Sequence, residues 1–217
     1  MSGFVIAVDG PAAAGKGAIA TSLGAAFGLP VLDTGLLYRA VGLAVQAAGD
    51  DVDDAAAAER HARALDLGRL DAPVLRTLEA GEAASRVAVH PAVRETLRAF
   101  QRDFAGQPGG AVIDGRDIGT VIAPDAPAKL YVTASAEARA RRRWLQLQAA
   151  GETASLEDIL ADIARRDATD SGRADSPMRP ADDAVLLDTT EMTIEAATDA
   201  ARRIVETARG EWERSRR

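Results

Sequence analysis

The fold is decided by the stretch Gly10-Pro11-Ala12-Ala13-Ala14-Gly15-Lys16-Gly17, which follows an apolar run at residues 4–8 and precedes a helical pattern through residue 27. Small residues let successive backbone N–H groups turn inward around phosphate oxygens, and the start of the helix adds partial positive charge. Lys16 supplies a mobile full charge that reaches the β- and γ-phosphates of a nucleotide. The sequence therefore predicts a phosphate-binding P-loop at residues 10–17.

The alternative for this stretch is a turn rich in glycine and alanine that binds nothing. With 19 glycines in 217 residues and Lys16 as one of two lysines, about 0.015 chance matches to G-x-x-x-x-G-K are expected. The residue after Lys16 is Gly17 rather than Ser or Thr, so the hydroxyl that usually binds magnesium is absent. We therefore expect no metal ligand from the protein, with Mg²⁺ held by phosphates and water.

Length and composition limit the class of protein. A chain of 217 residues forms one domain with small inserts and buries roughly 70% of its unfolded surface. The absence of cysteine excludes disulfides and thiolate metal sites, and no signal-like or long apolar segment occurs. A net charge of −7 argues against nucleic-acid binding. We expect a cytoplasmic monomer that contacts neither membrane nor nucleic acid.

Short apolar runs alternate with helical patterns along the chain, and this alternation predicts a parallel sheet covered on both faces. Five such strands are expected, at residues 4–8, 31–32, 111–113, 129–132 and 184–187. The stretch from about Leu65 to Ser85 has a poor pattern, which suggests short extended pieces in an insert outside the core. The last helix is expected from Thr193 to Arg209.

Two polar clusters follow predicted strands. Asp33, Tyr38 and Arg39 come after the second strand, and Asp114-Gly115-Arg116-Asp117 comes after the third. Loops at the carboxyl ends of parallel strands form the ligand crevice, so both clusters are predicted close to the P-loop. Helix capping and surface charge are the alternative for the first cluster. The acidic run at residues 50–54 is expected only to cap a helix.

Arginine accounts for 24 of the 26 basic residues, and several arginines gather in two segments. The helix after the fourth strand carries Arg139, Arg142 and Arg143 on one face, for which a solvated surface is the alternative. After a break near Gly151, Ser155 is expected to cap a helix that leads into the charged residues 165–173. This break and the arginine-rich helix end predict a mobile lid.

Together these segments resemble the bacterial cytidylate kinases, which are nucleoside monophosphate kinases, over nearly the whole chain. The matching segments are Asp9 to Gly17, Leu32 to Gly35 with Tyr38-Arg39, Asp114 to Thr120, Arg166-Asp167 with Asp170 and Arg173, and Leu187 to Thr190. A glycine after the P-loop lysine is typical of these kinases. No Asn-Lys-x-Asp guanine motif is present.

The resemblance implies an α/β fold, specifically a P-loop NTPase-type three-layer sandwich with a five-stranded parallel sheet, an acceptor-nucleotide-binding helical insert and a lid. It implies one kinase domain, with a core at residues 1–35, 106–150 and 184–217, an acceptor-nucleotide subdomain at about 36–105 and a lid at about 151–173. The implied activity is ATP-dependent phosphorylation of CMP and dCMP to CDP and dCDP in pyrimidine nucleotide metabolism. The implied ligands are therefore ATP, CMP and dCMP.

The resemblance also implies roles for individual residues. Ser85, Arg94 and Asp170 would meet the cytosine or its ribose, while Arg39, Arg116 and Arg173 would hold the acceptor phosphate. Asp33 and Asp114 would order the crevice, and Tyr38 and Asp117 would join the acceptor site. Residues 10–18 would bind ATP with the lid arginines Arg142 and Arg143, and the catalytic residues would be Lys16, Arg116, Arg166 and Arg173. Phosphoryl transfer needs positioning and neutralisation of charge, which these groups supply.

Three positions depart from the family pattern. Ala18 stands where the family often has threonine or serine, Thr169 stands where some members have arginine, and the insert around residues 70–84 is shorter than in many members. Two alternatives remain open: a P-loop kinase for another small acceptor such as UMP, and, because of Ala18, a nucleotide-binding regulatory protein without catalysis. Binding alone would not require so many phosphate-directed charges, which argues against the second.

Overall fold

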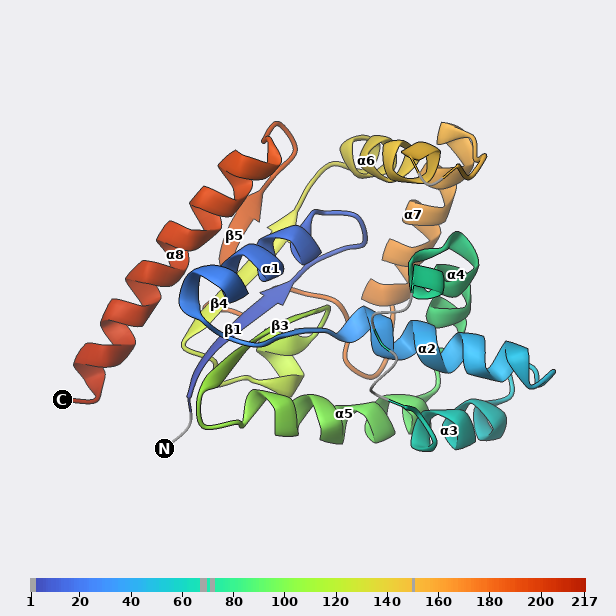
Figure 1. Ribbon diagram of the computed structural model, residues 1–217, viewed down its shortest axis with the longest axis horizontal. Coiled ribbons are helices and arrows are strands. Elements are labelled where there is room, and N and C mark those ends of the chain that lie inside the picture. The colour runs from blue at the N-terminus through green and yellow to red at the C-terminus, as the bar shows by residue number, and fades with distance from the viewer. Residues whose placement is uncertain (1–2, 67–69, 71–72, 150) are drawn as a thin grey trace. The chain divides into compact units, whose positions relative to one another are not determined.

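The computed structural model describes residues 3–66, 70, 73–149 and 151–217 (Figure 1). Contacts divide the chain into two compact units. The core unit contains the described residues up to Leu32 together with Ala105–Arg217, and the helical unit contains those of Asp33–Phe104. Among the described residues, no helix combines the length and the apolar character that crossing a membrane requires.

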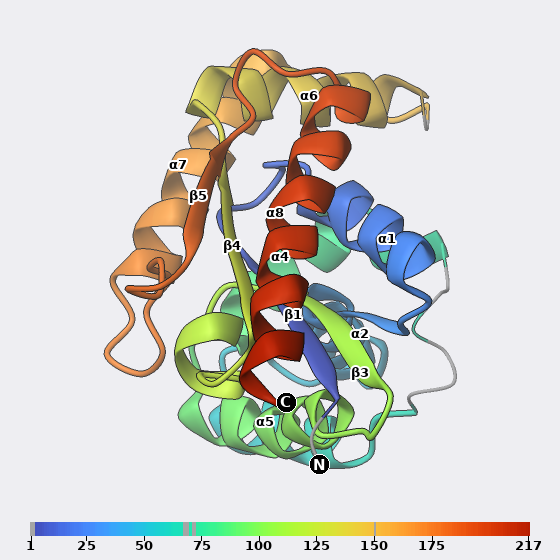
Figure 2. The same ribbon diagram turned by 90° about the vertical axis from the view of Figure 1, so that its left-hand side faces the viewer.

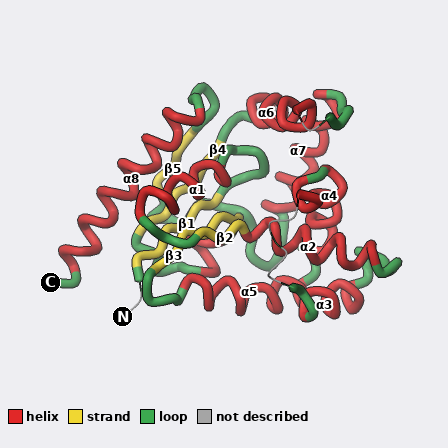
Figure 3. Tube along the Cα trace, in the orientation of Figure 1, coloured by secondary structure: helices red, strands yellow, loops and turns green. Residues whose placement is uncertain are grey.

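The predicted five-stranded sheet is confirmed, and its strands are shown together in Figure 3. In spatial order the strands are β2 (Val31–Asp33), β3 (Gly110–Gly115), β1 (Phe4–Asp9), β4 (Ala128–Thr133) and β5 (Val185–Asp188). The strand β1 pairs in parallel with β3 and β4, and β4 pairs in parallel with β5. Because β1 is central, the loop that follows it lies at the carboxyl edge of the sheet beside the ends of β3 and β4.

Helices α1 (Lys16–Phe27) and α8 (Ile194–Ser215) pack on the sheet of the core unit (Figure 2). Ile19 and Leu23 of α1 and Val205 of α8 join one apolar cluster with the strands. Ala7 on the alternate side of β1 is also fully buried, so both faces of this strand are covered. The remaining core-unit elements are the π-helical turn η3 (Ile118–Ile122), α6 (Ala136–Ala149) and α7 (Leu156–Ser171).

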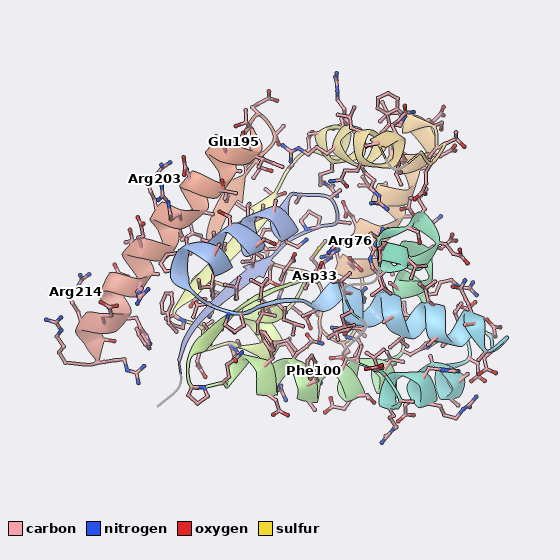
Figure 4. All side chains as sticks on the ribbon, viewed as in Figure 1. Asp33, Arg76, Phe100, Glu195, Arg203 and Arg214 are labelled. Carbon is pink, nitrogen blue, oxygen red and sulfur yellow. The ribbon has the colours of Figure 1, made fainter. Side chains whose placement is uncertain are left out.

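The last helix was predicted to end too early. It continues past Arg209 to Ser215 because Trp212 packs on Phe4, with ring centroids 5.3 Å apart. Arg203 and Arg214 project from the exposed side of this helix (Figure 4). One additional apolar residue at helical spacing therefore prolongs the amphipathic pattern.

The helical unit has its own core. It contains α2 (Thr34–Ala47), α3 (Ala55–Arg63), the 3₁₀ helix η2 (Pro73–Arg76), α4 (Leu78–Val87) and α5 (Pro91–Ala105), whose last residue belongs to the core unit. Leu37 and Val41 of α2 pack with Val93 of α5 in one buried cluster. Asp54 caps α3 by accepting a hydrogen bond from the backbone N–H of Ala56 at 2.9 Å, as expected for the acidic run.

The expectation of short extended pieces at residues 65–85 is wrong where the structure describes this stretch, which belongs to the helical unit. Pro73–Arg76 is a 3₁₀ helix, and Thr77 caps α4 by accepting from the N–H of Ala80 at 3.2 Å. Residues 67–69, 71 and 72 lie outside the described residues. The buried face of α4 consists mainly of alanines such as Ala83, and small residues give little hydrophobic periodicity although they allow close helix packing.

The contact between α2 and α4 predicts a sensitive position. A Cβ atom at Gly42 would lie 2.7 Å from the Cβ and 2.8 Å from the carbonyl carbon of Ala83. We expect Gly42→Val to lower the free energy of unfolding by about 1–3 kcal/mol through overpacking. Urea denaturation of this variant, with the exposed Ala47→Val of the same helix as the control, tests the close packing. Equal free energies of unfolding for the two variants would show that α4 can move away from α2 without loss of stability.

Candidate active site

The loop between β1 and α1 has the backbone of a phosphate cradle. Gly10, Ala13 and Gly15 have positive φ angles of 142°, 60° and 93°. A Cβ atom at Gly10 would lie 1.9 Å from the carbonyl oxygen of Val132, so only glycine fits there. Gly15 is the N-cap of α1. It has no side chain that could accept hydrogen bonds from the backbone N–H groups at the start of the helix. The predicted strand–loop–helix arrangement is confirmed, and it suits an anion.

Lys16 lies folded against the loop. Its Nζ donates to the carbonyl oxygen of Pro11 at 2.9 Å and lies 3.7 Å from Oδ1 of Asp114, the last residue but one of β3. The two side chains are only 6% and 8% exposed. The structure therefore brings the P-loop lysine and this predicted carboxylate together, since the ends of neighbouring parallel strands share one edge of the sheet.

A second group of predicted residues gathers around Asp170 of α7. Arg116, after β3, donates from Nε to Oδ2 of Asp170 at 3.0 Å, and Arg173 forms an ion pair with Oδ1. Nη1 of Arg166 lies 3.7 Å from Oδ2 of Asp162. Arg116 and Arg173 thus meet at one carboxylate with Arg166 on the same helix as that carboxylate, and guanidinium groups are well suited to binding a phosphate.

Electrostatics within this arginine cluster follow from burial and from the neighbouring charges. Burial by itself raises the pKa of Asp170, but Arg116 and Arg173 outweigh it and hold the pKa of this carboxyl below its usual value. Burial, followed by repulsion from Arg116, lowers the pKa of Arg166. Burial and repulsion therefore disfavour the charged form of Arg166, and a nearby anion would favour it.

Asp9 is a buried residue whose role the sequence analysis did not identify, although it directly precedes the P-loop. Its carboxylate accepts hydrogen bonds from the backbone N–H groups of Ile118 at 2.8 Å and Gly119 at 2.7 Å. Burial, helped by repulsion from Asp117, raises the pKa of Asp9 to about 6. Asp9 therefore anchors η3 to the end of β1, and the predicted site residue Asp117 lies buried at the start of that turn.

Arg139, Arg142 and Arg143 of α6 do not form the solvated face that was the alternative from sequence. Arg139 is 5% exposed, and its guanidinium group bonds to Ala12 and Asp167. Arg142 donates to Oγ1 of Thr189 at 3.0 Å and also to the carbonyl oxygen of that residue. Arg143 is partly buried, and this burial lowers its pKa.

From the sequence, no role is predicted for Asp167, Thr189 or Arg139 individually. Asp167 and Thr189 lie within segments that match the family, but spacing along the chain does not reveal their partners. Thr189 is 2% exposed and lies with its hydroxyl 3.1 Å from the carbonyl oxygen of Ala14. Arg139 and Thr189 therefore contact the P-loop from outside it, and Asp167 contacts Arg139.

The remaining predicted residues belong to the helical unit. Asp33 caps α2 by accepting a hydrogen bond from the N–H of Gly35 at 3.0 Å. This contact is the one that the helix-capping alternative predicted. Arg39 donates to the carbonyl oxygens of Leu75 at 2.9 Å and Thr77 at 3.1 Å. This arginine therefore ties α2 to the segment that leads into α4.

Tyr38 and Arg94 come together within the helical unit. The guanidinium carbon of Arg94 lies 5.8 Å from the centroid of the Tyr38 ring, and Arg94 is 4% exposed. Ser85 lies on α4 and is partly buried. The structure thus joins two of these predicted base-recognition and acceptor residues in one cation–π contact.

Comparison with known proteins adds independent information. The family model described as cytidylate kinase matches residues 6–207. The cytidylate kinase of Caulobacter vibrioides strain NA1000 is 66% identical over 207 residues, which are 95% of this chain and 97% of that protein. Those of Mesorhizobium japonicum and Xanthobacter autotrophicus are 57% and 58% identical over 94% and 95% of this chain, and 94% and 99% of their own lengths.

Proposed function

The chain belongs to the cytidylate kinase family, and from this premise we propose that it transfers the γ-phosphoryl group of ATP to CMP and dCMP, forming CDP and dCDP. One structural observation carries the proposal most directly: the core unit holds both the P-loop lysine and the arginine cluster around Asp170. The first suits the donor phosphates and the second suits a further phosphate. A regulatory protein without catalysis is not favoured.

We propose that phosphoryl transfer here depends on positioning and charge. The backbone amides of residues 10–18 would hold the β-phosphate of ATP, and Lys16 would follow the phosphoryl group as it moves. Arg116, Arg166 and Arg173 would neutralise the charge that spreads over the transferring oxygens and the acceptor phosphate. Arg142 and Arg143 would contribute to the lid over ATP.

Magnesium fits this site through phosphates and water rather than through a P-loop hydroxyl. Gly17 supplies no oxygen from a side chain, while Asp114 places a carboxylate oxygen 3.7 Å from Nζ of Lys16. Such a hard oxygen suits Mg²⁺, which usually keeps several water ligands. When bound with ATP, the ion would screen the negative charge of the β- and γ-phosphates. We propose that Asp114 accepts a hydrogen bond from one of the water ligands.

We propose that the helical unit, which falls within the expected subdomain at about residues 36–105, binds the acceptor nucleotide. The Tyr38–Arg94 contact supports this role because an aromatic face and a guanidinium group suit a planar base. Arg39 would serve the acceptor phosphate, Ser85 the base or ribose, and Asp33 would maintain the start of α2. For the core we propose the limits expected from the sequence, residues 1–35, 106–150 and 184–217. For the lid we likewise propose residues 151–173.

The proposed activity is tested by measuring ADP release with ATP, magnesium and each of CMP, dCMP, UMP and AMP. We expect kcat/KM for CMP and dCMP to exceed that for UMP and AMP by at least about tenfold, the scale of one specific interaction of 1.4 kcal/mol. Preferred turnover of UMP would favour the alternative acceptor. Nucleotide binding without turnover of any acceptor would favour the regulatory protein.

Ala18 allows a test of ATP binding at the P-loop. It lies in the first turn of α1 and is exposed, so Ala18→Thr would add a hydroxyl donor beside the bound phosphates. One such hydrogen bond contributes about 0.5–1.5 kcal/mol, which lowers KM for ATP about two- to tenfold. The bond forms equally in the ground and transition states, so kcat should change less.

The matched control for Ala18→Thr is Ala25→Thr, an exposed position farther along the same helix. Steady-state kinetics with varied ATP should show the lower KM only in the first variant. Weaker ATP binding in Ala18→Thr would mean that the added side chain meets protein rather than phosphate.

The proposed lid gives a further prediction. Residues 151–173 comprise a turn at Gly151 and α7, and closure over the site would exclude water that could hydrolyse ATP. We expect amide hydrogen exchange in this segment to slow when ATP and CMP analogues are both bound, with α8 as the internal reference. Unchanged exchange in residues 151–173 with both ligands present would contradict a lid.

A further inference from the structure

The outer side of the P-loop is held by side chains that come from distant parts of the core unit. Ala12 accepts a hydrogen bond at its carbonyl oxygen from Nη1 of Arg139 at 3.2 Å. The hydroxyl of Thr189 lies 3.1 Å from the carbonyl oxygen of Ala14. A loop whose N–H groups turn inward directs its carbonyl groups outward, so donors on this outer side stabilise the cradle.

Arg139 is the more constrained of these two donors. Its Nε donates to the carbonyl oxygen of Ala134 at 2.9 Å, and its two terminal nitrogens reach Oδ1 and Oδ2 of Asp167 at 3.1 and 2.6 Å. The Arg139 side chain is 6% exposed and that of Asp167 is 26% exposed. A planar guanidinium group can satisfy this carboxylate and two separate carbonyl groups at once, whereas an ammonium group cannot reproduce the fork.

The contact between Arg139 and Asp167 matters for the site because Asp167 lies close to the arginine cluster. It lies on α7 directly after Arg166 and within one helical turn of Asp170, which bonds to Arg116 and Arg173. Arg139 therefore connects the P-loop to α7, the helix that carries Arg166 and Asp170. The connection uses short, largely buried contacts, so it is stiffer than an exposed ion pair.

We propose that Arg139 and Asp167 are positioning residues, which hold the P-loop and the end of α7 at the separation that phosphoryl transfer requires. The inference rests on the proposed kinase function and adds to it two residues that touch neither nucleotide. Because reacting groups must be aligned closely, a displacement of about 1 Å can reduce the rate about 10²-fold. Loss of the pair should therefore lower kcat more than it raises KM.

The test uses Arg139→Lys, Asp167→Asn and the double variant in the full-length protein. We expect each single variant to lower kcat for CMP phosphorylation about 10- to 100-fold, with KM for ATP and CMP changing less than about threefold. The double variant should resemble the single variants, since both substitutions break the same connection. Asp167→Asn is nearly isosteric, so it serves if Arg139→Lys does not fold.

A matched control is the exposed ion pair Arg202–Asp199 of α8, whose nitrogen–oxygen distance is 3.1 Å. Arg202→Lys and Asp199→Asn should leave kcat unchanged. Thermal unfolding of every variant is measured as well. If Arg139 and Asp167 had a merely structural role, their variants would have a lower melting temperature but an unchanged kcat of the folded enzyme. Additive losses in the double variant, or kcat within threefold of wild type in the single variants, would overturn the proposal.

A second readout separates this proposal from the proposed function. Amide hydrogen exchange at residues 10–17 should be faster in Arg139→Lys and Asp167→Asn than in wild type without any nucleotide. A wild-type protein inactive on every monophosphate would defeat the proposed function, while the exchange data would still decide the positioning role. An active wild type with unchanged loop exchange in both variants would defeat the positioning role alone.

Discussion

Lys16→Met is expected to lower kcat at least about 10³-fold while the protein remains folded, because the transferring phosphates lose their mobile cation. Methionine has a similar length and suits a side chain that is only 6% exposed. The substitution removes the hydrogen bond to Pro11 and the charge beside Asp114. Steady-state kinetics and circular dichroism together measure the effect.

The other lysine provides the matched control. Nζ of Lys129 lies 2.8 Å from both carboxylate oxygens of Asp183, and the Asp183 side chain is 66% exposed. Lys129→Met should therefore lower the free energy of unfolding by about 1–2 kcal/mol, because solvent screens the exposed partner. The folded Lys129→Met protein should keep its activity. A folded Lys16→Met protein with unchanged kcat would refute the assignment of the P-loop lysine.

Arg173→Ala is expected to lower kcat/KM for CMP about 10²- to 10³-fold, which corresponds to about 2.7–4 kcal/mol of transition-state stabilisation. The Arg173 side chain is 8% exposed and pairs with Asp170, so the variant loses both a proposed phosphate ligand and a cation that orders the cluster. Both KM for CMP and kcat should change, whereas KM for ATP should change least. Kinetics with each substrate varied in turn measure these separate effects.

The same variant has a defined pH dependence. In wild type, Arg116 and Arg173 hold the pKa of Asp170 below 3.8 despite burial, so the ionised carboxyl stabilises the fold above pH 3.8 and this stabilisation is lost as the pH falls through the lower folded pKa. Without Arg173 the pKa of Asp170 should lie closer to 3.8, so the carboxyl should contribute less stability at neutral pH and less stability should be lost on acidification. Urea denaturation between pH 3 and pH 7 measures this smaller dependence on pH.

The control for Arg173→Ala is Arg179→Ala, at an arginine that is 59% exposed and 4.0 Å from the exposed Asp182. A weak, screened pair of this kind should affect neither kcat/KM nor the acid limb of the stability profile. If Arg173→Ala behaves like this control in kinetics, the arginine cluster does not serve the acceptor phosphate. The stability profile would then still report its electrostatic contact with Asp170.

Sequence alone determined the parts of this protein that depend on local chemistry. The P-loop is recognisable because glycine permits its positive backbone φ angles, as at Gly10 and Gly15. The strands are recognisable because buried parallel strands are continuously apolar, and the position of Asp114 follows because parallel strands end at one edge. Family resemblance supplied the kinase class, while the roles of the individual site residues remain proposals.

Tertiary structure alone decided which charged and small residues meet. Helical spacing placed Arg139 on one face with Arg142 and Arg143, but it did not show that Arg139 is buried against Ala12 and Asp167. The helix α4 was missed because its contact with α2 uses Gly42 and alanines, which carry little hydrophobic signal. Which residues contact a charged or small side chain depends on how segments distant in the sequence pack together. Local conformational preferences of the chain do not determine that packing.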